Sequence, residues 1–240
     1  MSYPVQRLRR LRQNASIRRL VRETSLSPAD FICPLFVSSR PDVNEPLAAM
    51  PGVALLSGAP LEAAVRELSA AGVPAVLLFA VLENHEKDPA AALACSPSGP
   101  VHHAAARIKS AAPDLAVIAD LCLCEYTLDG HCGLYRHGAI DNDATLEVLA
   151  RAAVSLAAAG ADVIAPSGMM DGATAALRAA LDREGFQRVL VMPYSAKYAS
   201  ALYGPFKSAT RSAPAESLHA THQLDPANAR QAMEEIRLDV

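Results

Sequence analysis

Three cysteines lie close together in one short segment, at Cys122, Cys124 and Cys132, directly after an apolar run typical of a strand. Three thiolates fill three corners of a tetrahedral zinc site, and a catalytic zinc keeps its fourth corner for water or substrate. Free cysteines also occur as plain packing residues, but three of the chain's five cysteines fall in this segment. An iron–sulfur cluster would need a fourth thiolate nearby. The pattern therefore favours a catalytic Zn²⁺ site.

A lysine is the second candidate for chemistry. Lys197 is one of only four lysines in the chain, and it follows an apolar run at 188–195 with tyrosines on both sides. Apolar surroundings lower the pKa of a lysine and leave a neutral amine that can form a Schiff base with a carbonyl substrate. Most lysines are solvated instead. The cysteine segment at another strand end favours the chemical interpretation.

Apolar runs and helical segments alternate along the chain. The runs are almost continuously apolar, as parallel strands covered on both faces are. The predicted strands are 31–37, 74–80, 115–122, 162–167 and 188–195, and the predicted helices are 61–71, 101–111, 142–159 and 173–184, with a further helix beginning near Asp225. The third helix has capping residues from Asp141 and ends at Gly160. Repeated strand–helix units predict an α/β fold with a parallel sheet, either doubly wound or a barrel.

Polar residues at the ends of successive strands favour the barrel. Asp120 and Cys122 end one predicted strand, Ser167 ends the next, and Ser195 and Lys197 lie at the end of the one after. Barrel active sites are built at the carboxyl ends of the strands. A closed barrel has eight strands, and only five are found. The sequence therefore predicts a TIM-barrel-like (β/α)8 fold that is incomplete within residues 26–240.

Composition limits the classes of partner. The chain is 51% hydrophobic and 20% charged, with a formal net charge of −3, so no nucleic-acid footprint is present. The first 23 residues are arginine-rich and polar, unlike a signal peptide, and no apolar stretch reaches the length of a membrane span. We expect a cytoplasmic protein, in which cysteines stay reduced unless they bind metal or react.

Several strings resemble the porphobilinogen synthase family, also called 5-aminolevulinate dehydratase. The most specific are the cysteine segment 119–133, Tyr-Ser-Ala-Lys-Tyr-Ala-Ser at 194–200 and Tyr-Gly-Pro-Phe at 203–206. Others are the basic strings at 7–12 and 18–24 and the apolar strings at 34–37, 50–53, 74–79, 160–167 and 169–172. The resemblance implies a TIM barrel preceded by an extended N-terminal arm, residues 1–25, that is used in oligomer contacts. It also implies an enzyme that joins two molecules of 5-aminolevulinate into porphobilinogen with loss of water.

The resemblance implies roles position by position. The residues matched to zinc ligands are Cys122, Cys124 and Cys132. The residues matched to the substrate pocket or lid are Ser167, Tyr203, Phe206 and Lys207. Asp120 matches a carboxylate that can move or orient protons, and Lys197 matches the lysine that holds one of the two substrates as a Schiff base. Zinc would act as a Lewis acid near the condensing carbonyl.

Other positions depart from the family pattern. Lys207 replaces a carboxylate-binding arginine, which turns a bidentate clamp into a point charge. The remaining replacements are Gly168 for an aspartate, Pro193 for a strand serine, and His219 with Ala220 for a second basic pair. The family's second Schiff-base lysine lies in a Val-Lys-Pro string on the next strand, and the sequence reaches Val240 just before that string.

Three functions remain open at this point. The first is a porphobilinogen-forming enzyme that obtains the second lysine from outside these residues. The second is a diverged enzyme that keeps zinc and Lys197 but carries out another condensation or lyase step on 5-aminolevulinate or a similar keto acid. The third is a non-catalytic regulatory homologue. In each case open sheet edges predict a homo-oligomer, with the basic arm before Ser25 as the first candidate contact.

Overall fold

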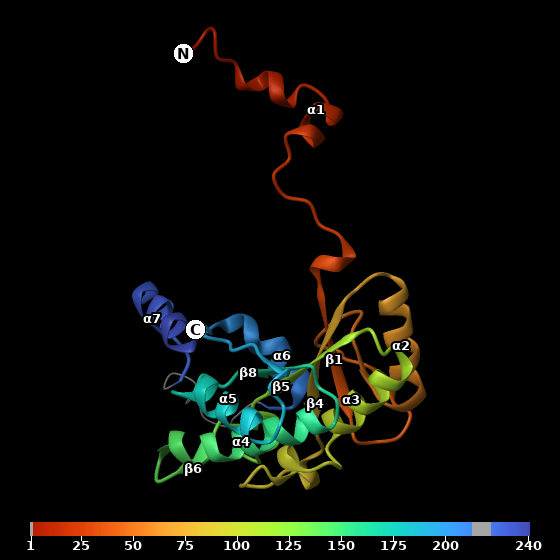
Figure 1. The fold of residues 1–240 in the computed structure, drawn as a ribbon, viewed down its shortest axis with the longest axis vertical. Coiled ribbons are helices and arrows are strands. Elements are labelled where there is room, and N and C mark those ends of the chain that lie inside the picture. The colour runs from red at the N-terminus through yellow and green to blue at the C-terminus, as the bar shows by residue number, and fades with distance from the viewer. Residues whose placement is uncertain (1, 213–221) are drawn as a thin grey trace.

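A mainly parallel sheet is the centre of the structure, a computed structural model that describes residues 2–212 and 222–240 (Figure 1). Seven strands form it in the order β2-β3-β1-β4-β5-β8-β9, and only β2 runs antiparallel to its neighbour. The predicted α/β fold with a parallel sheet is confirmed. That this sheet is part of an incomplete barrel stays a prediction.

The predicted strands correspond to five of the seven in the sheet. The bounds are β1 (Ile32–Ser38), β2 (Asn44–Pro46), β3 (Ala54–Leu56), β4 (Ala75–Val81), β5 (Ala116–Leu121), β8 (Val163–Pro166) and β9 (Leu190–Val191), with a separate hairpin of β6 (Tyr135–Arg136) and β7 (Ala139–Ile140). The prediction missed β2 and β3, which have three residues each. The prediction of a long buried strand at 188–195 is wrong. β9 has two residues, and Leu190 is 64% exposed because β9 is an edge strand among those described.

The four predicted helices are confirmed to within a few residues, and all pack on one face of the sheet. They are α2 (Gly58–Ala70), α3 (Pro100–Ala111), α4 (Asn142–Ala158) and α5 (Ala173–Arg183). Their apolar stripes join alternate strand residues in the largest core cluster. The Asp141 side chain caps α4 by accepting from Ala144 N at 3.0 Å, and Gly160 lies beyond its end with φ +104°, as predicted.

The other face of the sheet carries a smaller apolar cluster over β1 and β4. The short η6 (Ala201–Tyr203) leads into α6 (Gly204–Thr210), which lies on this face. The ring of Phe206 packs on Phe79 and Phe36, with centroid distances of 4.9 and 6.0 Å. The helix predicted near Asp225 is α7 (Ala229–Asp239). Other 3-10 turns are η2 (Pro28–Asp30), η3 (Asn84–Glu86), η4 (Ala92–Cys95) and η5 (Leu123–Glu125).

The N-terminal segment lies apart from the sheet (Figure 1). It contains η1 (Leu8–Arg12) and α1 (Ala15–Leu20), and every residue from 2 to 32 is exposed except Ile17, which is half-buried. This is the segment predicted to be an arm, and its contacts in an oligomer stay a prediction. Within residues 2–212 and 222–240, no helix has both the length and the hydropathy needed to cross a membrane.

Candidate functional site

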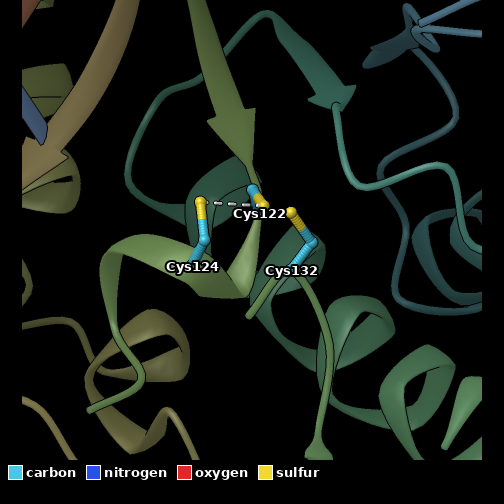
Figure 2. Close-up of side chains that lie close together, drawn as sticks. All are labelled: Cys122, Cys124 and Cys132. Atoms are coloured by element: carbon cyan, nitrogen blue, oxygen red, sulfur yellow. Dashed lines mark hydrogen bonds between the residues drawn. The ribbon is translucent and has the colours of Figure 1, made fainter. Parts of the chain in front are cut away.

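The three cysteine side chains converge at the carboxyl end of β5 (Figure 2). Cys122 follows the last residue of the strand, Cys124 lies in η5, and Cys132 returns from the following loop. Their sulfur atoms all lie within 4.8 Å of one another, and Cys122 Sγ lies 3.2 Å from Cys124 Sγ. The sulfurs of a tetrahedral zinc with 2.3 Å bonds are about 3.8 Å apart. The donor set and its spacing therefore fit zinc.

The loop that returns Cys132 is held by its own side chains. Thr127 Oγ1 donates to the carbonyl oxygens of Leu123 and His131, at 3.1 and 3.2 Å. The His131 ring also stacks on Tyr135, with the centroids 4.6 Å apart. These contacts close the loop and bring Cys132 beside Cys122, where both are buried.

The thiols differ in acidity because they hydrogen-bond to one another. Hydrogen bonds with Cys124 and Cys132 hold the pKa of Cys122 well below its ordinary value, assisted by the charge of Lys197 and opposed by burial. The hydrogen bonds to Cys122 raise the pKa of Cys124 and of Cys132 well above their ordinary values. The hydrogen bonds within the cluster therefore stabilise a single thiolate.

Lys197 lies beside this cluster, in the segment that follows β9. Its Nζ donates to the backbone carbonyl of Ser167 at 2.7 Å and lies 5.8 and 5.7 Å from the ring centroids of Tyr194 and Tyr203. Lys197 and Ser167 therefore meet, as predicted for the ends of neighbouring strands, and Tyr203 joins them. The amine is enclosed by aromatic rings and by the carbonyl end of β8.

The predicted low pKa of Lys197 is wrong in direction. Burial does lower the pKa, but the negative charges of the three cysteine sulfurs and of Asp120 together outweigh burial and raise it above its ordinary value. Apolar neighbours in the sequence indicated desolvation alone. The sequence did not reveal that so many acidic groups surround the amine.

Asp120 is buried at the end of β5, on the face of the sheet opposite the large helix layer. Burial raises its pKa to about 7, the charge of Cys122 adds to that effect, and the Ser167 hydroxyl and Lys197 oppose it. Within the described part of the chain, no group donates a hydrogen bond to Asp120 Oδ1. A carboxyl group with this pKa can both accept and donate a proton near neutral pH.

The two α6 residues expected at the pocket have different environments. Phe206 packs on Phe36 and Phe79 at the smaller apolar cluster, and these contacts hold α6 on the sheet. Its predicted contact with substrate stays a prediction. Lys207 follows it and is half-buried. The structure thus brings Tyr203 to the amine, whereas the contacts of Phe206 are those of a core residue.

Two of the departures from the family pattern have clear structural settings. Gly168 is buried against the cysteine loop, and a Cβ placed on it would lie 3.4 Å from the Cys132 carbonyl oxygen. Pro193 removes no ladder hydrogen bond, because the N–H groups of Met192 and Tyr194 are the ones that donate to the β8 side, at 2.9 and 3.1 Å. Two further departures, His219 and Ala220, lie outside the described residues.

Sequence reasoning missed two buried ionisable residues beside the cysteines. Glu125 Oε2 accepts from Ala80 N at 2.8 Å, and burial raises the pKa of this carboxyl well above its ordinary value. Lys87 Nζ donates to the carbonyl oxygen of Arg211 at 2.7 Å, and burial lowers its pKa. A signal was available for Lys87, because the polar run 83–88 closely follows the predicted strand 74–80, at the end where barrel sites are built.

Comparisons with known proteins give one consistent family. A family model described as delta-aminolevulinic acid dehydratase matches residues 5–240. The delta-aminolevulinic acid dehydratase of Halalkalibacterium halodurans is 50% identical over 234 residues, which cover 98% of this chain and 71% of the relative. That of Synechococcus elongatus is 48% identical over 242 residues, which cover 99% and 74%.

A solved structure extends the similarity to the fold. It is the crystal structure of delta-aminolevulinic acid dehydratase (porphobilinogen synthase) from Toxoplasma gondii in complex with the reaction product porphobilinogen. It superposes with a TM-score of 0.92 at 37% identity and covers 99% of this chain and 68% of that one. The similarity therefore includes both the sheet and the residues at its carboxyl edge.

Proposed function

Because the chain belongs to the delta-aminolevulinic acid dehydratase family, we propose that it acts as a porphobilinogen synthase on 5-aminolevulinate. The observation that carries the proposal is the setting of Lys197. A primary amine lies beside a carboxyl group with a pKa of about 7 and a three-thiol metal set, all at one edge of the sheet. The similarity to the dehydratases favours this function over a diverged enzyme or a regulatory homologue.

We assign the metal site to Cys122, Cys124 and Cys132, with Zn²⁺ as the ion. The three sulfurs match the thiolate preference of zinc, and a set of three leaves one coordination position open. When bound, zinc would supply Lewis-acid polarisation of a substrate oxygen and would offset the negative charge of the thiolates. Burial of Cys122 and Cys132 keeps competing water away from the site.

Lys197 is proposed to hold one substrate. The Lys197 ammonium group first gives one proton to a neighbouring base, and the neutral amine then adds to the ketone carbon of 5-aminolevulinate. Return of that proton to the new hydroxyl group lets it leave as water, which leaves an iminium linked to Nζ. The iminium withdraws electrons and acidifies the neighbouring carbon. The rings of Tyr194 and Tyr203 stand 5.8 and 5.7 Å from Nζ, so they enclose the adduct and restrict its orientation.

Asp120 is proposed to move the proton that this chemistry requires. Its carboxyl group is buried and has a pKa of about 7, so both protonation states are populated near neutral pH. Ser167 contributes its backbone carbonyl to the amine. Lys207 and Phe206 belong to α6, where Lys207 would provide a point charge for a substrate carboxylate and Phe206 would hold the helix in place.

We also propose that the chain forms a homo-oligomer through its N-terminal segment. Leu8, Leu11, Leu20 and Val21 are between 48% and 85% exposed, although all are apolar. Clusters of exposed apolar side chains mark contact surfaces. Light scattering at micromolar concentration should give a mass of at least two chains, and a monomer of unchanged activity would contradict the proposal.

The experiment that tests the function is borohydride trapping with 5-aminolevulinate, followed by peptide mapping and an assay for porphobilinogen. We expect a reduced adduct on Lys197, together with product. An adduct on Lys197 without product would support the diverged enzyme instead. Peptide mapping also covers Lys207, the other lysine of this region. An adduct on Lys207 would identify it as a second reacting amine. No adduct on any lysine would contradict the proposed chemistry.

A further inference from the structure

The loop that follows β4 is attached to the cysteine segment. At the end of β4, Ala80 N donates to Glu125 Oε2 at 2.8 Å. Further along the loop, Asp88 N donates to the carbonyl oxygen of Tyr126 at 3.1 Å. Glu125 and Tyr126 directly follow Cys124, so these bonds fix the loop relative to the cysteines.

The same loop also holds the end of α6. Lys87 Nζ donates to the carbonyl oxygen of Arg211, 124 positions away in the sequence, at 2.7 Å. Arg211 is the first residue beyond α6 and has a left-handed backbone with φ +52°. Its guanidinium forms a second link, an ion pair with Glu83 at 2.5 Å. The loop therefore bridges two segments that both contribute to the proposed site.

The two links differ in burial, and the more buried link contributes more to holding α6 against the loop. The side chains of Arg211 and Glu83 are 42% and 40% exposed, and exposed ion pairs contribute little. Lys87 is 7% exposed, and a buried ammonium group needs hydrogen-bond partners to offset its lost hydration. Its bond to the end of α6 is therefore maintained, and it fixes the distance between α6 and the loop.

The end of α6 is itself built into the core. Thr210 and Ser212, which flank Arg211, are both buried, and their hydroxyl oxygens lie 2.6 Å apart. Thr210 Oγ1 also donates to the carbonyl oxygen of Phe206 at 3.1 Å. These contacts and the Lys87 bond together hold the end of α6 in one position. Loss of the Lys87 bond therefore affects the order of the whole helix.

We propose that Lys87 is a positioning residue that holds α6, and with it Tyr203 and Lys207, in place relative to the cysteine segment. The part that concerns substrate rests on the proposed function. In the parent protein α6 is already ordered before substrate binds. Without the Lys87 bond α6 opens locally more often, and substrate must supply the free energy of ordering it.

Hydrogen–deuterium exchange of the full chain tests this inference without reference to activity. We expect Lys87→Met to speed exchange of the amides in residues 204–212 by about tenfold and to leave α3 and α4 unchanged. Arg211→Gln removes the exposed ion pair but keeps the carbonyl that Lys87 uses, so its effect should be smaller. Lys109→Met is the matched control, because Lys109 also donates to a backbone carbonyl, that of Leu115, but lies before β5. Exchange in 204–212 that is unchanged by Lys87→Met, or by Lys87→Gln if the methionine variant does not fold, would overturn the inference.

Steady-state kinetics then separates positioning from simple loss of structure. We expect Lys87→Met to raise KM for 5-aminolevulinate by about tenfold and to change kcat by less than about threefold, because binding includes the ordering of α6. Lys87→Arg, which can still donate to the carbonyl, should recover most of the loss. Equal loss of kcat in all variants with unchanged KM would overturn the substrate part. A parent protein that makes no porphobilinogen would refute the proposed function, while the exchange result would still decide the role of Lys87.

Discussion

Two lysines stand at opposite ends of β8 and have different surroundings. Before the strand, Lys109 Nζ forms an ion pair with Asp162 at 2.9 Å, and both side chains are partly exposed. After the strand, Lys197 Nζ donates to the Ser167 carbonyl and is surrounded by thiols, a buried carboxyl group and aromatic rings. In parallel sheets covered by helices, chemistry is concentrated at the carboxyl ends of strands and stability at the amino ends. The comparison predicts that substitution of Lys197 mainly lowers activity, whereas substitution of Lys109 mainly lowers stability.

The largest effect is expected for Lys197→Met. Removing the amine removes the group proposed to bind substrate covalently, so activity should fall on the order of 10⁴-fold. Thermal stability should fall as well, because the substitution removes the hydrogen bond to the Ser167 carbonyl, the contacts with the two tyrosine rings and the attraction to the neighbouring acidic groups. Porphobilinogen assays and calorimetry on the same preparations measure both. Activity within tenfold of the parent would show that Lys197 does not carry the reaction.

The second effect concerns the metal. Replacing Cys122, Cys124 and Cys132 with serine removes all three sulfurs from the cluster, and zinc content should fall from about one per chain to nearly none. The double variant Cys33→Ser/Cys95→Ser is the control, since those thiols lie outside the cluster. Elemental analysis after dialysis gives the answer. A triple variant with the parent's zinc content would place the metal elsewhere.

The residues at the carboxyl edge of the sheet also show how much of the structure can be predicted from the sequence. The strand ends, the four helices and the meeting of Asp120, Ser167 and Lys197 were predictable, because each depends on periodicity and on the common edge of parallel strands. The extent of β9 was not, because an apolar run does not indicate whether a neighbouring strand covers it. Lys87 and Glu125 were missed because their partners are distant in the sequence.

The third prediction uses His102, a buried group of the helix layer away from the site. Its Nε2 lies 2.8 Å from Ser155 Oγ, and burial, with a smaller contribution from His103, lowers its pKa from 6.5 to about 4. The unfolded chain therefore binds more protons than the folded chain between these pH values, so stability is lost as pH falls from 6.5 towards 4. The full loss corresponds to about 3 kcal/mol.

Urea unfolding at a series of pH values measures that loss. His102→Gln keeps a hydrogen-bonding side chain that does not titrate, so its stability should vary less with pH across the same window. His85→Gln is the control, because this histidine lies outside the helix layer, in η3. Parallel pH profiles for the parent and His102→Gln would show that His102 does not control acid stability.

The smallest effect is expected for Lys109→Met, which completes the comparison. The ion pair with Asp162 is partly exposed, with side chains 32% and 43% accessible, so its loss should cost about 1 kcal/mol or less of unfolding free energy. Asp162 would keep its hydrogen bond from Val117 N at 2.8 Å, which limits the damage. Activity should stay within about twofold of the parent, because the substitution lies at the amino end of β8 and changes no group near Lys197. Urea unfolding and the porphobilinogen assay on the same preparation test both halves. A Lys109 variant that loses activity while keeping its stability would contradict the division between the two ends of β8.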